Sequence, residues 1–368
     1  MKTIHVSRRQ LLAMTVAFGL ATALRLPTAA AHGAPALLRR TVEGLPEGLV
    51  GHIFTADEHG SSISMIDMSK GEAVTVPIPI APHNVDLTPD RQFLLAVGEP
   101  SDGGHGHGGG HAHGKEAEGR LLVFDPRGIE DGALAEIAVG DHPAHVVASG
   151  DSRFAFVTNA GDDTVSVVDL GARKAVATVG TGRYPHGLRL SPDGGELYIA
   201  NVLDGSVSVI DVGERREVAR IPVGKAPVQV SFLPDGSRVY VSLRDEDSVA
   251  VIDTAKREVV ARVAVGNGPI QVHATPDGRL VYAANEGSRE SPSDTVSVID
   301  VATAQVVDTI RTGSGAHGVS VSADGDWVFV TNIVAGTVSV IDRHRGTVRA
   351  DIPVGRGPNG IAFCPLEA

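Results

Sequence analysis

The chain has 368 residues, of which 42% are hydrophobic and 21% charged, so it is long enough for one large domain or two ordinary ones. Its 44 glycines, 21 prolines and 4% aromatic residues indicate many turns and a core of aliphatic side chains, which favours an all-β protein with short strands. A net charge of −12 argues against nucleic acid as a partner, and the single cysteine, Cys364, excludes an internal disulfide, a CxxCH haem attachment site and a cysteine-rich metal centre.

The first 31 residues have the features of a twin-arginine signal peptide. Arg8 and Arg9 precede a mildly apolar segment, Leu11–Leu24, which is too short to span a membrane as a stable helix. Ala29–Ala31 then offers an A-x-A cleavage site. We therefore expect residues 1–31 to be a signal peptide for the twin-arginine route. The mature protein is expected to be periplasmic or extracellular and not embedded in the membrane.

A short repeat runs through the rest of the chain. The segment T/S-V-S-V-I-D, with small variations, recurs five times and two looser copies precede it. The aspartates that end the seven copies are Asp67, Asp125, Asp169, Asp211, Asp253, Asp300 and Asp342. The last five are 42, 42, 47 and 42 residues apart, a period that indicates a repeat architecture with seven units.

Each repeat carries four strand signals. In one unit they fall at residues 228–233, 238–242, 248–252 and 258–263, and Pro234-Asp235-Gly236 supplies the first turn. Val and Ser alternate in the third strand, as expected for a sheet, and no 3.6-residue periodicity supports a helical solenoid. Four strands in 40–45 residues are typical of one β-propeller blade.

The two ends of the chain complement each other. The N-terminal part offers strands two to four of a blade, whereas residues 359–364 offer a lone first strand. The N-terminal strands are predicted at residues 50–56, 62–66 and 73–78. Joining the two ends completes a seventh blade and removes the free sheet edges. We therefore predict a seven-bladed propeller over residues 50–365, preceded by a linker at 32–49.

The second strands carry a recognisable motif. It is spelled Phe156-Val-Thr-Asn159, Tyr198-Ile-Ala-Asn201 and Phe329-Val-Thr-Asn332, each followed by the T/S-V-S-V-I-D segment. On these residues the chain resembles the YVTN-repeat propellers, which include the YncE-like periplasmic proteins. The resemblance covers nearly the whole mature chain and specifies architecture rather than function.

The same resemblance implies where the histidines lie. In this strand order, the start of each innermost strand is at the same face as the loop between strands two and three. Aligned on the Pro-Asp-Gly turns, the first position of the innermost strands reads His83, Ala144, His186, Val228, Ile270, His317 and Asn359. The neighbouring position reads Asn84, His145, Gly187, Gln229, Gln271, Gly318 and Gly360. The resemblance thus implies four histidines near one mouth of the central channel.

A histidine-rich insertion belongs to the same face. Residues 99–119 connect strands two and three of the blade that carries His83, and His59 occupies the corresponding loop of the closing blade. The insertion is rich in glycine and contains His105, His107, His111 and His113. Neutral imidazole is a common ligand of zinc and copper, so we predict that the insertion captures metal ions and that the four channel histidines hold one.

Two looser resemblances sharpen this prediction. The propeller of nitrous-oxide reductases is similar in placing histidine-bound copper at one channel mouth. This chain lacks the cysteine-bearing copper domain of that enzyme, which excludes the complete enzyme. The chain also resembles periplasmic zinc metallochaperone propellers that carry a histidine-rich loop.

Three functions stay open at this point. The first is a metal carrier or buffer whose partners are zinc or copper and a periplasmic or cell-surface protein. The second is an enzyme, either a lactonase-like hydrolase or an oxidoreductase of metals or tetrapyrroles. The third is an interaction scaffold at the cell surface. No G-x-S-x-G motif is present, and no residue is assigned as catalytic.

Overall fold

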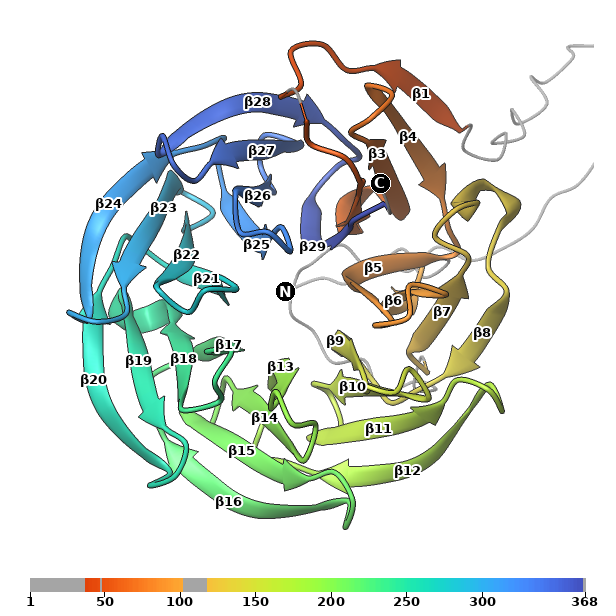
Figure 1. Ribbon diagram of the computed structural model, residues 1–368. Helices are drawn as coiled ribbons and strands as arrows, with labels where there is room; N and C mark the ends of the chain where they lie inside the picture. The colour runs from red at the N-terminus through yellow and green to blue at the C-terminus, as the bar shows by residue number, and fades with distance from the viewer. Residues whose placement is uncertain (1–36, 47, 102–117, 367–368) are drawn as a thin grey trace, which may run out of the picture. The chain divides into compact units, whose positions relative to one another are not determined.

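The computed structural model describes residues 37–46, 48–101 and 118–366. They form seven antiparallel sheets arranged in a ring, with one strand of each sheet near the axis (Figure 1). The predicted all-β, seven-bladed propeller is therefore confirmed. The proposed signal peptide, residues 1–31, lies outside the described residues. Among the described residues, no helix has the length and apolar character needed to cross a membrane.

Six blades each consist of four consecutive strands. Blade 1 consists of β5 Ile80–Leu87, β6 Leu94–Pro100, β7 Arg120–Phe124 and β8 Ala135–Ala138. Blade 2 consists of β9 Pro143–Ala148, β10 Phe154–Asn159, β11 Thr164–Asp169 and β12 Lys174–Gly180. Blade 3 consists of β13 Pro185–Leu190, β14 Glu196–Asn201, β15 Ser206–Asp211 and β16 Arg216–Pro222. Blade 4 consists of β17 Pro227–Phe232, β18 Arg238–Leu243, β19 Ser248–Asp253 and β20 Glu258–Ala264. Blade 5 consists of β21 Pro269–Ala274, β22 Leu280–Gly287, β23 Pro292–Asp300 and β24 Gln305–Arg311. Blade 6 consists of β25 Ala316–Val321, β26 Trp327–Asn332, β27 Thr337–Asp342 and β28 Thr347–Pro353.

The seventh blade, here called the clasp blade, joins the two ends of the chain. Its strands are β1 Leu38–Thr41, β2 His52–Asp57, β3 Ser62–Asp67, β4 Glu72–Pro77 and β29 Pro358–Cys364. The C-terminal β29 pairs with β2, as predicted, and closes the ring. The structure adds an outermost fifth strand, because β1 pairs with β4 from within the segment assigned to the linker.

The exceptional repeat spacing of 47 residues has a local cause. Strands β22 and β23 are longer than their counterparts, and their pairing continues outward from Asn285 and Thr295 to Gly287 and Pro292. The extra residues therefore lengthen one hairpin and leave the blade intact.

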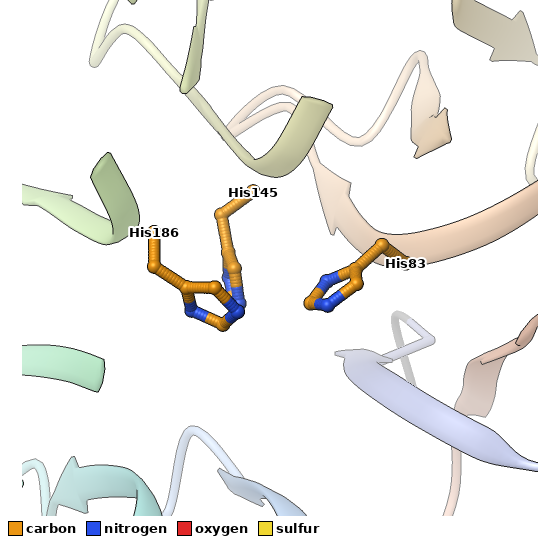
Figure 2. Close-up of side chains that lie close together, drawn as sticks. All are labelled: His83, His145 and His186. Carbon is orange, nitrogen blue, oxygen red and sulfur yellow. The ribbon is translucent and has the colours of Figure 1, made fainter. Parts of the chain in front are cut away.

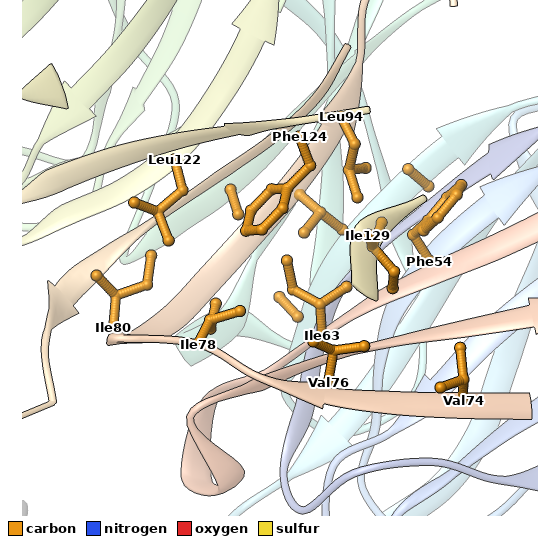
Figure 3. Packing of buried hydrophobic residues seen from close by; sticks show 14 of the residues in the cluster. Phe54, Ile63, Val74, Val76, Ile78, Ile80, Leu94, Leu122, Phe124 and Ile129 are labelled. Carbon is orange, nitrogen blue, oxygen red and sulfur yellow. The ribbon is translucent and has the colours of Figure 1, made fainter. Parts of the chain in front are cut away.

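The core lies between neighbouring blades. Phe54 and Ile63 of the clasp blade pack with Leu94 and Leu122 of blade 1, and all four are fully buried (Figure 3). Third strands such as β15 are buried along almost their whole length, whereas outermost strands such as β16 bury few residues. Because both faces of each blade are covered by neighbours, the Val, Ile and Ser residues of a third strand such as β15 are all buried.

The repeated aspartates end the third strands by capping the following turn. Asp211 accepts a hydrogen bond from the backbone N–H of Glu214 at 2.7 Å, and Asp253 does the same for Lys256 at 2.9 Å. These carboxylates are turn formers, as predicted from the sequence.

Candidate metal centre

Three histidines from consecutive blades meet near the axis of the ring. His83 on β5, His145 on β9 and His186 on β13 point their rings toward one another (Figure 2). The ring centroids are 5.5 Å apart for His83–His145, 4.9 Å for His83–His186 and 4.8 Å for His145–His186. One nitrogen from each ring lies within 4.8 Å of the others. We call these three residues the axial cluster.

A bulge at the start of each innermost strand turns these side chains toward the axis. The pairing of β13 with β14 jumps from Pro185 to Leu188, which leaves His186 and Gly187 outside the regular register. Similar shifts occur in β5 at His83 and in β9 around His145. Such bulges redirect side chains that a regular strand would hold at right angles to its sheet. The alignment of the repeats predicted the shared position of these histidines but not the bulge at it.

The threonine of the Phe156-Val-Thr-Asn159 motif ties two of these strands together. The backbone N–H of His145 donates to the Thr158 hydroxyl at 2.9 Å, and that hydroxyl donates to the backbone carbonyl of His186 at 2.7 Å. Thr331 makes the equivalent bridge between Gly318 and Asn359. The motif therefore fixes the spacing of neighbouring innermost strands, which explains why it specifies architecture.

Burial favours the neutral imidazole at two of the three cluster residues, His145 and His186. His145 is fully buried, and His83 and His186 are partly buried. Desolvation, together with the neighbouring imidazoles, lowers the pKa of both His145 and His186 well below the ordinary value of 6.5. Neutral imidazole is the form that binds a metal ion.

Two nitrogens of the cluster lack a hydrogen-bond partner within the described structure. They are Nδ1 of His83 and Nε2 of His145. The third ring is oriented through its other nitrogen, because Nδ1 of His186 lies 3.2 Å from the backbone carbonyl of Val228. A hydrogen bond from Nδ1–H to a carbonyl leaves Nε2 with a lone pair, which is the usual arrangement of a metal-binding histidine.

A glutamine two blades away reaches His145. Nε2 of Gln229, on β17, lies 3.3 Å from Nδ1 of His145, while its Oε1 accepts the backbone N–H of Val230 at 2.8 Å. Gly187, in the intervening blade, lies against this glutamine, because a Cβ atom there would overlap Gln229 Oε1. The sequence placed Gln229 in the position next to the histidine slot but gave no sign that it contacts His145.

His317, the fourth predicted channel histidine, lies outside the axial cluster. It is 6% exposed on β25, and its Nε2 is 3.5 Å from Oε2 of Glu286. Burial is the main cause that lowers its pKa, the neighbouring Glu286 carboxylate offsets part of this effect, and His83 lowers the pKa further. Glu286 was not recognised from the sequence.

The remaining predicted ligands are not brought to the cluster by the described structure. His59 lies in the 3₁₀ helix η1, Glu58–Gly60, where its backbone carbonyl accepts a hydrogen bond from Arg356 at 2.7 Å. The other four histidines lie outside the described residues; they are His105, His107, His111 and His113.

A second group of possible ligands was missed. Nδ1 of His142 lies 3.2 Å from Oε1 of Glu99 and 3.0 Å from Oδ1 of Asp141. Glu99 ends strand β6 just before the histidine-rich insertion, and His142 precedes β9. His142 is more than half exposed, so this group lies at the surface.

Three further titratable residues lie on the innermost strands, beyond the cluster. Asp86 and Arg189 follow His83 and His186 by three residues on β5 and β13. Burial raises the pKa of Asp86 and lowers that of Arg189, while each partly offsets the effect of burial on the other. Burial also lowers the pKa of His273, on β21, to about 4. These residues were not singled out from the sequence, because each is isolated in its own repeat.

Two family models match parts of the chain. "Lactonase, 7-bladed beta-propeller" matches residues 130–290, and "Cytochrome D1 heme domain" matches residues 235–358. Each match covers less than half of the chain. No curated protein matches the chain in sequence.

Solved structures of similar shape cover most of the chain. The periplasmic gluconolactonase PpgL of Pseudomonas aeruginosa has a TM-score of 0.68 at 20% identity, with 86% of this chain and 99% of that one covered. The hydrazine synthase of Kuenenia stuttgartiensis gives 0.65 at 20%, with 79% and 97% covered. A functionally unknown protein of Desulfotomaculum acetoxidans gives 0.70 at 15%, with 86% and 100% covered. At these identities the likeness shows the fold, a seven-bladed propeller.

Proposed function

We propose that this protein binds a transition metal ion, zinc or copper, at the axial cluster and acts as an exported metal carrier or buffer. The observation that carries the proposal is the meeting of three imidazoles, with one nitrogen of each within 4.8 Å of the others, in a largely buried place. We also propose that the twin-arginine signal delivers the folded protein to the periplasm or the exterior.

The chemistry of the cluster suits such an ion. Zinc and copper both accept neutral imidazole, and the lowered pKa values keep protons from competing at neutral pH. A buried polar nitrogen without a partner destabilises the protein, and a metal ion bound at His83 Nδ1 would supply that partner. In this proposal the histidine-rich insertion, residues 99–119, captures ions before they reach the cluster.

Elemental analysis of the folded, exported protein tests the proposal. We expect close to one zinc or copper ion per chain after the loosely held ions have been removed by dialysis. His83→Ala and His186→Ala should lose this ion, whereas His344→Ala should retain it, because His344 is exposed and pairs with Asp326. Deletion of residues 103–114 should weaken capture and leave the tightly held ion. Equal retention by His83→Ala and wild type would overturn the assignment.

A lactonase-like hydrolase is the second candidate. The lactonase model matches residues 130–290, which include β9 and β13 and therefore two histidines of the cluster. Hydrolysis of gluconolactone that is lost in His145→Leu and His186→Ala would favour this function. The match to the cytochrome D1 heme domain begins at residue 235 and includes none of the three cluster histidines. This match therefore supports an oxidoreductase function at the cluster less than the lactonase match supports a hydrolase.

A further inference from the structure

The side-chain amide of Gln229 has one possible orientation. Its Oε1 accepts the backbone N–H of Val230 at 2.8 Å, and turning the amide over would place two donors against each other. The Nε2 amide group, which can only donate, therefore faces Nδ1 of His145 at 3.3 Å. Because this nitrogen accepts a hydrogen bond, the neutral His145 ring carries its proton on Nε2.

His186 has the opposite arrangement. Within the described residues, its Nδ1 has one hydrogen-bond partner, the carbonyl oxygen of Val228, which can only accept. Its proton is therefore on Nδ1, and its Nε2 presents a lone pair. Two histidines of one cluster are thus held in different tautomers by the groups behind them.

The Nε2–H of His145 is a buried donor without a partner. His145 is fully buried, and this nitrogen makes no hydrogen bond within the described structure. A protonated nitrogen cannot bind a metal ion, but it can donate to an oxygen atom. A metal ion can therefore bind nitrogens of His83 and His186, and an oxygen atom can accept a hydrogen bond from the ring of His145.

We propose that the axial cluster binds a carboxylate-bearing ligand together with the metal ion, with His145 Nε2–H as the donor to the carboxylate. This inference rests on the proposed function and names the second component that the site takes. Gln229 acts as a positioning residue, since it touches neither component and sets the tautomer of His145.

Two arginines contribute positive charge near the cluster, and Asp245, whose Oδ1 lies 2.8 Å from Nε of Arg244, offsets part of it. The guanidinium of Arg189 acts electrostatically on His145, and that of Arg244 acts on His186. Arg189 donates to the backbone carbonyl of Leu188 at 2.9 Å, and Asp86 offsets part of its charge. A charge-assisted bond to a carboxylate is also stronger than a bond to a neutral oxygen.

The tautomer of His145 is testable without a metal. Long-range ¹⁵N–¹H spectra of the metal-free protein distinguish a ring protonated at Nε2 from one protonated at Nδ1, and His145→Gln identifies the signal. We expect His145 to be protonated at Nε2 and His186 at Nδ1. In Gln229→Glu the new carboxylate accepts a hydrogen bond from Nδ1, so the His145 proton should move to that nitrogen. A His145 ring protonated at Nδ1 in wild type would overturn the inference.

Binding of Co²⁺, followed through its visible absorption, tests the division of roles. Acetate should tighten Co²⁺ binding and alter the spectrum of wild type, with chloride at the same ionic strength as the control. His145→Leu should keep Co²⁺ binding and lose the acetate effect, whereas His145→Gln, which restores a donor, should regain it. Gln229→Glu should tighten Co²⁺ binding about tenfold or more, because the third ring becomes a ligand.

The outcomes separate the two proposals. If His145→Leu loses Co²⁺ as completely as His83→Ala does, His145 is a metal ligand and the inference is wrong, while the proposed function stands. If wild type binds none of Co²⁺, zinc and copper, the proposed function fails. In that case acetate titration of the His145 signal decides whether the site binds a carboxylate alone, and an unmoved signal refutes the inference as well.

Discussion

The Ser64 hydroxyl donates a 2.6 Å hydrogen bond to the carboxylate of Asp57. Four other blades have asparagine at the position of Asp57. Asp57 ends strand β2 of the clasp blade and is fully buried. Thr55 and Ser62 also donate to it, at 2.8 and 3.3 Å. The asparagines of the other blades are Asn159, Asn201, Asn285 and Asn332, and their amides donate to the Ser and Thr hydroxyls of the following strand.

Asp57→Asn should stabilise the protein at alkaline pH. Burial raises the pKa of Asp57 from 3.8 to about 7, so its folded pKa is higher than its unfolded pKa. The stabilisation of the folded state by the protonated form is complete below pH 3.8 and is lost as pH rises through 7. The shift corresponds to roughly 4 kcal/mol of folding free energy. Wild type loses this stabilisation as the pH rises through 7, whereas the uncharged variant keeps it. Urea denaturation at about pH 5 and about pH 8.5 should show an advantage of the variant that grows with pH.

The reverse substitution in another blade is the matched control. Asn201 is fully buried, and its amide donates to Ser208 at 2.9 Å. Asn201→Asp places a carboxylate in the equivalent position of blade 3, so it should destabilise the protein more at about pH 8.5 than at about pH 5. A pH-independent difference between Asp57→Asn and wild type would show that Asp57 does not titrate in this range.

Gly187→Ala should break the contact between Gln229 and His145. A methyl group at this position would overlap Gln229 Oε1 and lie 2.6 Å from the backbone carbonyl of Val228. Overpacking of this kind costs about 1–3 kcal/mol of stability. Denaturation with urea measures the loss, and the His145 signals in ¹⁵N spectra report the tautomer. Gly180→Ala is the control, because a Cβ atom there meets nothing within 4 Å.

The sequence repeat predicted most of the fold because each blade uses the same residue types at the same positions of its strands and turns. The third strands are buried on both faces, so Val and Ile recur there, and the following aspartates cap the next turn. Strand β1 was missed for the opposite reason. Its sequence, Leu-Arg-Arg-Thr, has no counterpart in the other blades, and it joins β4 through backbone pairing that any sequence can make.

The candidate site was predicted only in part because its details depend on neighbours in space. The alignment of the chain's own repeats placed His83 and His186 in one position and His145 in the next, and the structure brings the three together. The contact of Gln229 with His145 requires a glycine at 187 in the intervening blade, a condition that involves three repeats at once. His317 occupies the same slot as His83, but Glu286 from the preceding blade engages it.

Removal of β29 should open the ring. Strand β29, Pro358–Cys364, is the innermost strand of the clasp blade, and Ile361 and Phe363 pack in the core between that blade and blade 6. The truncated chain would expose the edge of β2, whose unpaired backbone groups would then pair with strands of other chains. We expect loss of soluble monomer in size-exclusion chromatography. A truncation that removes only residues 366–368 should behave as wild type, and a stable monomer without β29 would contradict the role of the clasp.

Zinc should stabilise the folded protein through the axial cluster. A ligand that binds only the native state at 100 times its dissociation constant adds about 2.7 kcal/mol to the free energy of unfolding. We expect zinc to raise the midpoint of thermal unfolding in a variant that lacks residues 103–114, so that histidines of the insertion do not contribute. Adding His83→Ala or His186→Ala should abolish the increase. Adding His344→Ala should preserve it, since that ring is exposed and lies 2.9 Å from Asp326 Oδ1. An equal increase in all these variants would place the zinc elsewhere on the propeller.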